Sequence, residues 1–289
     1  MKRKLALLLA GVMTLGLVGC GSSTSTTTTE TTTEAATEAA TEEAATEVAA
    51  SGETFELKLG HIQTAEHPLG QSAEYFAELV SEYTGGAVTI SIFPASQLGS
   101  ESEIFDAVDI GSIDFALLGF GEPADKFTDI GIFDAPYLAD DRDHMVRILN
   151  SDETFALFEE MTEYMNVKGL GGFYYGARYL TTANDEVRSP EDMTGLNIRV
   201  PDQTMYIETL SAMGCVATPM SFSEVYLSLQ QGVIDGEENP LSSIASNKFD
   251  EVQTYLIKTE HIIGTQALYV STGTLDSLPA EYVTAIEAA

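Results

Sequence analysis

The chain has 289 residues, a formal net charge of −32 at pH 7 and only 13 lysine and arginine residues. Such an acidic chain repels nucleic acid and anionic lipid, so neither is expected as a partner. Hydrophobic residues make up 44% of the sequence, which is ordinary for a globular protein. Lys2, Arg3 and Lys4 account for three of the cations, so an anionic ligand would have to be met by a few of the other ten, focused inside a cleft.

The N-terminus is typical of a bacterial lipoprotein signal. Three basic residues precede an apolar run from Leu5 to Val18 that is too short to span a membrane and ends in Leu17-Val18-Gly19-Cys20. This pattern predicts a signal peptide over residues 1–19 and lipidation of Cys20. The alternative is an ordinary secretory signal in which Cys20 is incidental. We therefore expect an extracytoplasmic protein that the lipid anchors to the cell membrane.

Residues 20–53 predict a disordered tether behind the lipidated cysteine. The stretch from 21 to 53 is rich in Thr, Glu and Ala and has no aromatic residue, so it buries too little surface to offset the entropy of ordering. A flexible coil of this length spans roughly 30 Å. With Cys20 lipidated, Cys215 has no disulfide partner and is expected to be a small buried hydrophobe in a strand.

From residue 55 onward, the hydrophobic pattern predicts alternating strands and helices, without an internal repeat. Ser151 is expected to cap a helix that reaches Met165, and residues 250–258 to form a helix or a crossing segment. We expect further strands at 55–59, 88–93, 115–118, 169–174 and 267–272, and further helices at 69–83, 104–108 and 279–289.

The segment from residue 196 to 240 is the most informative part of the sequence. It predicts a strand with Arg199 at its end, a helix from Thr204 to Met213, a strand over 215–218 and a second helix over 224–231. Ser221 and Glu224 have the spacing of a capping box for that helix, and a turn containing Asn239 follows. Strands that alternate with helices indicate a parallel sheet, in which ligands bind beyond the carboxyl ends of the strands.

This segment resembles the solute-binding proteins of tripartite ATP-independent periplasmic (TRAP) transporters. The motifs are Ile-Arg-Val-Pro at 198–201, Pro-Met-Ser-Phe-Ser-Glu-Val-Tyr at 219–226 and Asp-Gly-Glu-Glu-Asn-Pro at 235–240, and weaker similarity continues from about residue 55 to the C-terminus. The resemblance implies capture of a small organic acid and its delivery to TRAP membrane subunits. It implies neither a cofactor nor a metal.

The fold implied by the resemblance is a two-lobed α/β periplasmic-binding-protein-like fold with a hinged central cleft. One lobe would comprise residues 54–175 with 264–289, and the other residues 176–263. Members of the family usually continue with a long helix that braces both lobes. This sequence ends before such a helix, so it departs from the family pattern there.

The resemblance also implies ligand-binding residues. Arg199 matches the family arginine that grips the substrate carboxylate with two hydrogen bonds, a task that suits a planar guanidinium. Arg178 matches a second arginine of the cleft, with a salt bridge between the lobes as the alternative. Asn239 matches the asparagine of the Glu-Asn-Pro turn, where an Asx-turn before Pro240 is compatible with ligand contact.

Further candidates are Phe222 as an apolar wall of the cleft, with a core position as the alternative, and Gln266. The loop that holds Glu66 and His67, together with His61, looks like a metal or acid–base cluster. Family members instead use this loop to line the binding site. The sialic-acid branch of the family has a carboxylate where this chain has Gly119, so the resemblance does not favour that sugar acid.

A secreted enzyme is the main hypothesis from another class. The sequence contains no Gly-x-Ser-x-Gly elbow, no His-Glu-x-x-His and no Gly-Lys-Ser/Thr phosphate loop, so we expect no enzymatic activity. A solute-sensing lipoprotein, or a binding protein for an ABC permease, is the nearer alternative.

Overall fold

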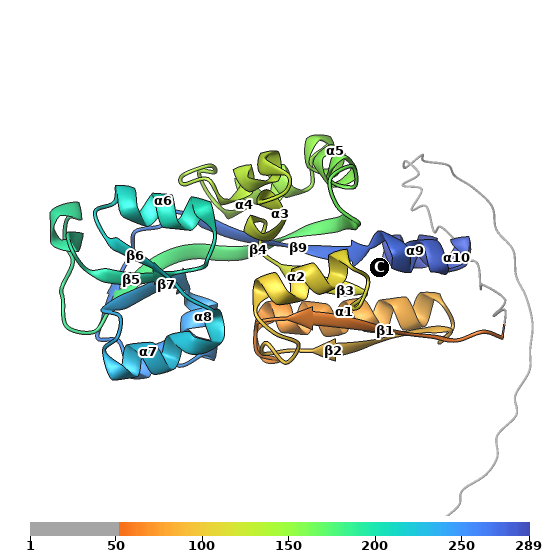
Figure 1. The fold of residues 1–289 in the computed structure, drawn as a ribbon, viewed down its shortest axis with the longest axis horizontal. Helices are drawn as coiled ribbons and strands as arrows, with labels where there is room; N and C mark the ends of the chain where they lie inside the picture. The colour runs from red at the N-terminus through yellow and green to blue at the C-terminus, as the bar shows by residue number, and fades with distance from the viewer. Residues whose placement is uncertain (1–51) are drawn as a thin grey trace, which may run out of the picture. The chain divides into compact units, whose positions relative to one another are not determined.

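The computed structural model describes residues 52–289, so the predicted signal peptide, Cys20 and residues 21–51 of the predicted tether lie outside the described part. Strands and helices alternate along it, as the sequence predicts (Figure 1). The strands are β1 (Phe55–His61), β2 (Val88–Phe93), β3 (Phe115–Leu118), β4 (Val167–Thr182), β5 (Asn197–Val200), β6 (Val216–Pro219), β7 (Gly236–Pro240), β8 (Tyr255–Ile257) and β9 (Ile263–Ser271). The helices are α1 (Pro68–Tyr83), α2 (Glu101–Asp109), α3 (Gly121–Ala124), α4 (Arg142–Leu149), α5 (Asp152–Met161), α6 (Thr204–Ala212), α7 (Val225–Gln231), α8 (Leu241–Ser246), α9 (Thr272–Ser277) and α10 (Ala280–Ala288).

The strands of residues 52–289 join one mixed sheet in the order β2-β1-β3-β9-β4-β7-β5-β6, with β8 beside β4. β1 pairs in parallel with β2 and β3, and β5 pairs in parallel with β6 and β7. The neighbours from β3 through β9 and β4 to β7 are antiparallel. The parallel pairing predicted for residues 196–240 is confirmed, and antiparallel strands separate it from the parallel strands near the N-terminus.

The long strands β4 and β9 connect the two ends of this sheet. β4 pairs with β9 as far as Ala177, and from Arg178 it pairs with β7. In Figure 1, β1, β2 and β3 therefore lie at one end and β5, β6 and β7 at the other, with β4 and β9 running between them. We call these the β1 end and the β5 end.

The hydrophobic core covers both faces of the sheet at the β1 end. Phe115 and Leu117 of β3 pack with α1 and α10 on one face, whereas the alternate residues Ala116 and Leu118 pack with α2 and α5 on the other. Alternation of this kind is the period of two expected for a strand buried on both faces. At the β5 end, smaller clusters pack under α6 and under α7 with α8. Cys215 joins the first of them and is buried as predicted, but it lies one residue before β6 and not in the strand.

Two helix predictions need correction. Ser151 caps α5 by accepting a hydrogen bond from the Thr154 amide, as expected, but the helix ends at Met161 and not at Met165. The capping box at Ser221 does not form, because a 3₁₀ turn over Phe222–Glu224 occupies that position and α7 begins at Val225 without a side-chain cap.

Two strand predictions also need correction. The segment predicted as a turn, Asp235 to Pro240, is mostly the buried strand β7, and residues 250–258 contain a 3₁₀ turn and the short strand β8 where a helix or crossing segment was expected. Gly236 allows β7 to approach β4 closely, because a Cβ there would lie 2.0 Å from the Thr181 carbonyl oxygen. β7 is a central strand whose charged residues find partners on its neighbours.

Candidate functional site

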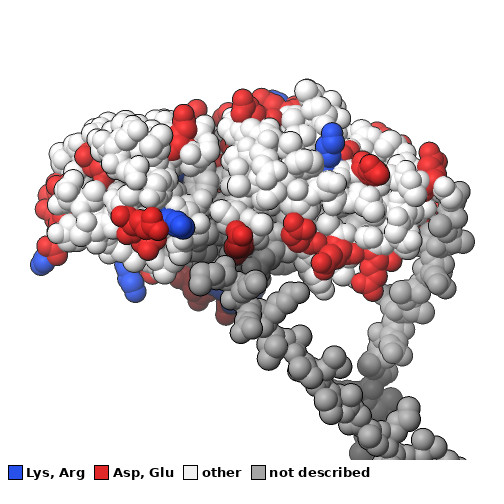
Figure 2. All heavy atoms as spheres, turned by 90° about the horizontal axis from the view of Figure 1, so that it is seen from below, with Lys and Arg blue, Asp and Glu red and all other residues white. Residues whose placement is uncertain are grey.

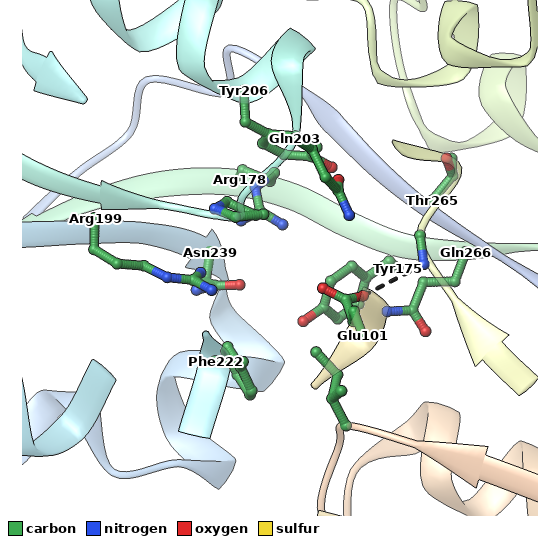
Figure 3. A pocket seen from close by; sticks show the side chains of 13 residues that line it. Glu101, Tyr175, Arg178, Arg199, Gln203, Tyr206, Phe222, Asn239, Thr265 and Gln266 are labelled. Carbon is green, nitrogen blue, oxygen red and sulfur yellow. Dashed lines mark hydrogen bonds between the residues drawn. The ribbon is translucent and has the colours of Figure 1, made fainter. Parts of the chain in front are cut away.

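A pocket with an empty volume of about 340 Å³ lies between the two ends of the sheet. Arg199 and Asn239 reach it from β5 and β7, near the carboxyl ends of these parallel strands, as the sequence predicts. β4, β9 and α2 supply the other walls (Figure 3). The lining residues are Ile62, Glu101, Gly119, Tyr175, Arg178, Arg199, Pro201, Gln203, Tyr206, Phe222, Asn239, Thr265 and Gln266.

Arg199 is buried in this pocket without an ionic partner among residues 52–289. Its Nε and Nη2 atoms both donate to the Met220 carbonyl oxygen, at 3.0 and 2.6 Å, and its guanidinium lies 5.6 Å from the centroid of the Phe222 ring. These contacts use two of the five N–H groups, so the edge formed by Nη1 and Nη2 keeps one hydrogen on each nitrogen for a ligand. Burial lowers the pKa of Arg199.

Arg178 lines the same pocket but is already paired. Its Nε and Nη2 atoms donate to the two carboxylate oxygens of Glu238 on β7, at 2.5 and 2.8 Å. The guanidinium also lies 4.8 Å from the centroid of the Tyr206 ring. Because Glu238 balances its charge, Arg178 adds no net positive charge to the pocket. Burial alone would raise the pKa of Glu238, but Arg178 and His261 lower it to about 2.

Asn239 projects from β7, where its backbone lies opposite Tyr179 of β4, so the Asx-turn considered for it is not formed. Its Nδ2 atom donates to Glu237 Oε2 at 2.7 Å. The Thr181 hydroxyl donates to the other oxygen of that carboxylate at 2.7 Å. Glu237 is buried, which raises its pKa to about 7. The contact orients the Asn239 amide at the rim of the pocket, next to Arg199 (Figure 3).

Phe222 and Gln266 both line the pocket, from opposite sides. Phe222 contacts the Phe249 ring edge-on with 5.9 Å between ring centroids, so it is at once a wall of the pocket and part of the core below α7. Gln266 projects from β9 and is 2% exposed, and its Oε1 atom has no hydrogen-bond partner among the described residues.

Glu66 and His67 do not line the pocket. The Glu66 side chain is exposed, whereas His67 is buried behind Tyr175, with 5.6 Å between the ring centroids. His67 Nδ1 accepts from the Leu69 amide at the start of α1, which leaves the proton of the neutral ring on Nε2, 3.4 Å from the Ser243 hydroxyl. Since burial lowers the pKa of His67 to about 4, the ring is neutral at pH 7 and holds Tyr175 in place.

Sequence reasoning missed the acidic wall formed by Glu101 and Glu122. Glu101 is the first residue of α2 and faces the pocket across from Arg199, with the Gly119 amide 3.5 Å from one of its oxygens. Glu122 of α3 accepts from Gln203 Nε2 at 2.8 Å, and burial together with the Glu101 charge raises its pKa to about 8. The signal was the Ser100-to-Glu103 capping box, which places Glu101 at the start of a helix beside β3.

Sequence reasoning also missed Tyr206, Asp134 and Thr265. The Tyr206 hydroxyl donates to Asp134 Oδ1 at 3.0 Å, and burial raises the pKa of Asp134 to about 7. Thr265 of β9 is 1% exposed, and its Oγ1 atom has no hydrogen-bond partner among the residues described. None of the three stands in a recognisable motif, so only the fold brings Tyr206 and Thr265 to the pocket and Asp134 to the Tyr206 hydroxyl.

Residues 52–289 contain no group of three or more His, Cys, Asp or Glu side chains placed to hold a metal ion. In the same range, no helix has both the length and the apolar character that crossing a membrane requires.

A mixed α/β fold with a small, charged pocket between two ends of its sheet defines a protein that binds a small solute. Comparison with known proteins agrees: the profile of the family DctP, "Bacterial extracellular solute-binding protein, family 7", matches residues 59–289. The chain belongs to this family of TRAP transporter solute-binding proteins, and the two-lobe α/β architecture predicted from the sequence is confirmed.

Relatives in this family bind different organic acids. The chain is 34% identical over 215 residues to the solute-binding protein RD1_1052 of Roseobacter denitrificans, an alignment that covers 74% of this chain and 65% of the relative. The structure of that protein with bound L-galactonate superposes with a TM-score of 0.78 over 82% of this chain and 78% of the other, at 31% identity. The C4-dicarboxylate-binding periplasmic protein DctP of Rhodobacter capsulatus is 31% identical over 84% of this chain and 72% of its own length.

Proposed function

We propose that this protein captures a small organic acid outside the cytoplasm by its carboxylate and delivers it to the membrane subunits of a TRAP transporter. The observation that carries the proposal is Arg199, a buried guanidinium that forms no ion pair with any carboxylate of the described chain. An uncompensated buried charge is costly, and a ligand carboxylate on the Nη1–Nη2 edge would remove that cost. Family membership supports the transport role.

Electrostatics favour recognition inside the pocket over attraction at the surface. The charged side chains on the face seen in Figure 2 are mostly acidic, with few lysines and arginines among them. An anion approaching this surface is repelled, so its affinity has to come from donors that are buried and pre-oriented. Asn239, beside Arg199 in the pocket, supplies an amide for the same carboxylate or for a neighbouring hydroxyl.

The test is calorimetry of the mature protein with a panel of aldonates, uronates and dicarboxylates, followed by the same titrations on two variants of Arg199 and one control variant. Arg199→Ala should weaken binding by roughly 30-fold to several thousand-fold, about 2 to 5 kcal/mol. Arg199→Lys should also weaken it strongly, because lysine keeps the charge but loses the two-pronged geometry.

The matched control for the arginine variants is Arg188→Ala. Arg188 is an exposed arginine that forms an ion pair with the exposed Glu186. Its loss should leave the ligand affinity within a factor of two or three of the wild-type value. Affinity near that of the wild type in Arg199→Ala would show that Arg199 is structural and would remove the basis of the proposal.

We propose further that the site closes between two lobes, one of residues 54–175 with 264–289 and the other of residues 176–263. The change of pairing partner along β4, at Ala177 and Arg178, supports this division. Small-angle scattering should show compaction when the pocket is saturated, and an unchanged radius of gyration with ligand bound would reject closure.

We also propose that residues 1–19 are a signal peptide and that lipid on Cys20 anchors the mature chain to the membrane, with the following Thr/Glu/Ala-rich stretch as a tether. The sequence Leu17-Val18-Gly19-Cys20 supports this proposal. Cys20→Ala should leave a soluble or uncleaved protein in cell fractionation. A variant that stays in the membrane fraction, cleaved as in the wild type, would exclude lipidation of Cys20.

A further inference from the structure

Among residues 52–289, the pocket has a single cation that is free for a ligand. Arg178 and Arg199 are both buried at its wall, but Arg178 is neutralised by a two-pronged ion pair with Glu238. Arg199 donates only to a neutral carbonyl. The charge balance therefore matches one ligand carboxylate, and a second carboxylate on the same ligand would find no cation of its own.

The wall opposite Arg199 is acidic. Glu101 faces the pocket from the start of α2, and Glu122 lies close enough to Glu101 for each carboxyl to oppose ionisation of the other. These two carboxyls also border an adjoining cavity, which shares Glu101, Arg199, Pro201 and Phe222 with the pocket. Burial raises the pKa of Glu101, while the charge of Arg199 lowers it. A second ligand carboxylate on this side would be repelled by the ionised form of Glu101 and would raise the pKa of this carboxyl further, which costs free energy.

The same wall offers hydrogen-bond acceptors, one of which, the Thr265 hydroxyl, can also donate. Gln266 Oε1 and Thr265 Oγ1 are buried with no partner among the described residues, and both residues line the pocket. The amide oxygen of Gln266 only accepts, and the carboxylate of Glu101 does the same when ionised. Buried acceptors without a partner are costly, and a ligand hydroxyl can donate to them, whereas a carboxylate has no hydrogen to give.

From these three observations we infer that the pocket is selective for polyhydroxylated monocarboxylates, bound with the carboxylate on Arg199 and the hydroxyl-bearing end on Glu101, Thr265 and Gln266. Glu101 is the residue that rejects dicarboxylates. This inference rests on the proposed function, since it assumes that Arg199 binds the ligand carboxylate. It assigns the chain to acids of the aldonate type and excludes C4-dicarboxylates, although both classes occur among its relatives.

Matched pairs of acids test the inference directly. D-erythronate and meso-tartrate share a four-carbon skeleton, and L-galactonate and galactarate share a six-carbon one. Within each pair the acids differ only in whether the terminal carbon is a CH₂OH or a carboxylate. Calorimetry of the wild-type protein should give at least 100-fold tighter binding for the better-bound monocarboxylate than for its dicarboxylate partner.

Glu101→Gln is the decisive variant, because it removes the negative charge and keeps the size of the side chain. It should lower the ratio of the two affinities at least tenfold, mainly through tighter binding of the dicarboxylate. Glu224→Gln is the matched control: Glu224 is an exposed carboxyl that borders the adjoining cavity, so its loss removes the same charge from that side and should leave the ratio unchanged. Circular dichroism should show both variants folded.

The outcomes separate this inference from the proposed function. If the wild type binds meso-tartrate, galactarate or succinate as tightly as the monocarboxylates, and Arg199→Ala abolishes that binding, the proposed function stands and the selectivity is refuted. A ratio in Glu101→Gln that equals the wild-type ratio likewise refutes the role of Glu101. If no acid of either class binds in a manner that depends on Arg199, the proposed function fails and the inference fails with it.

Discussion

Two arginines lie in the same pocket in opposite electrostatic situations. The charge of Arg178 is balanced within the protein by Glu238, and the Glu238 carboxylate also contacts His261 Nε2 at 3.1 Å. Arg199 contacts a carbonyl oxygen and an aromatic face, and within the described residues it forms no ion pair with a carboxylate. Arg178 therefore stabilises the folded protein without ligand, whereas Arg199 is available to bind the ligand.

Removal of these two side chains should affect stability differently. Arg178→Ala leaves the Glu238 carboxylate buried without its main counter-ion, which typically costs about 3 to 5 kcal/mol and should lower the Tm by roughly 10 °C. Arg199→Ala removes a buried charge that forms no ion pair, so the Tm of the empty protein should change little. Differential scanning calorimetry of both variants without ligand checks this difference. Equal losses would show that Arg199 is also part of an internal charge balance.

At the scale of residues, the sequence locates the side chains that stand in a recognisable motif. Arg199 and Asn239 sit in the Ile-Arg-Val-Pro and Glu-Asn-Pro segments, and the fold brings both to the pocket. Thr265 and Tyr206 carry no such signal, because their place depends on which strand becomes the neighbour of β4 and where α6 lies. Glu66 shows the converse: its loop resembles the family loop, yet its side chain is exposed.

At the scale of elements, strand prediction failed for β7, where polar and charged residues stand in place of the usual apolar strand residues. The sequence of β7 is Gly-Glu-Glu-Asn-Pro, which has low strand propensity and reads as a turn. Its carboxylates are satisfied by Thr181, Asn239, Arg178 and His261, so the strand is stabilised by long-range partners that the local sequence does not show. The parallel strands around β5 were predicted because their apolar residues follow the ordinary pattern.

The second half of β4 was missed for a related reason. β4 contains four glycines, and its pairing with β9 shifts register between Gly169 and Gly171 and again between Tyr174 and Gly176. Glycine lowers the strand signal, so the sequence predicted a strand that ended at Tyr174. Glycine is required at several of these positions because a Cβ at Gly169 or Gly172 would collide with Phe158 or Leu149 of the covering helices.

Among these glycines, Gly176 is the one next to the pocket, and substitution there should clearly destabilise the protein. Its φ is +140°, which side-chain-bearing residues rarely adopt, and a Cβ there would lie 2.7 Å from Pro240 Cβ, next to Asn239. Gly176→Ala should therefore destabilise the protein by about 1 to 3 kcal/mol. Gly171→Ala in the same strand is the control, since a Cβ there meets nothing within 4 Å. Urea denaturation measures both variants, and equal midpoints would show that β4 adjusts at Gly176 without cost.

At the scale of the whole described domain, hydrogen bonds cross the pocket between the two ends of the sheet. Gln203 donates to Glu122 and Tyr206 donates to Asp134, in each case from the β5 end to a residue near the β1 end. Tyr175 joins Gln63 to Ser243 through its hydroxyl, at 2.8 and 2.6 Å. Polar contacts thus join the two ends of the sheet across the pocket, and two of them use a carboxyl group whose pKa is raised by burial.

These raised pKa values predict a loss of stability between pH 6.5 and 8. The pKa of Glu122 is about 8, and those of Asp134 and Glu237 are about 7, so in this interval the folded chain holds protons that the unfolded chain has already released. Stability therefore falls as the pH rises, by about 1.4 kcal/mol per pH unit for each proton held only in the folded state. His61 and His67, with pKa values lowered from 6.5 to about 4, act in the opposite direction, but only below pH 6.5.

Glu122→Gln should make the pH dependence shallower, because glutamine keeps the bond partner of Gln203 and cannot ionise. The variant should therefore lose less of its Tm than the wild type between pH 6.5 and 8, in thermal melts at constant ionic strength without ligand. Glu74→Gln, on the exposed face of α1, removes one carboxyl at a site away from the carboxyls whose pKa is raised. This control should lose Tm with rising pH as steeply as the wild type. If Glu122→Gln and Glu74→Gln both lose Tm with rising pH as steeply as the wild type, the Glu122 carboxyl is already ionised in the folded protein. Its contact with Gln203 then does not depend on a proton.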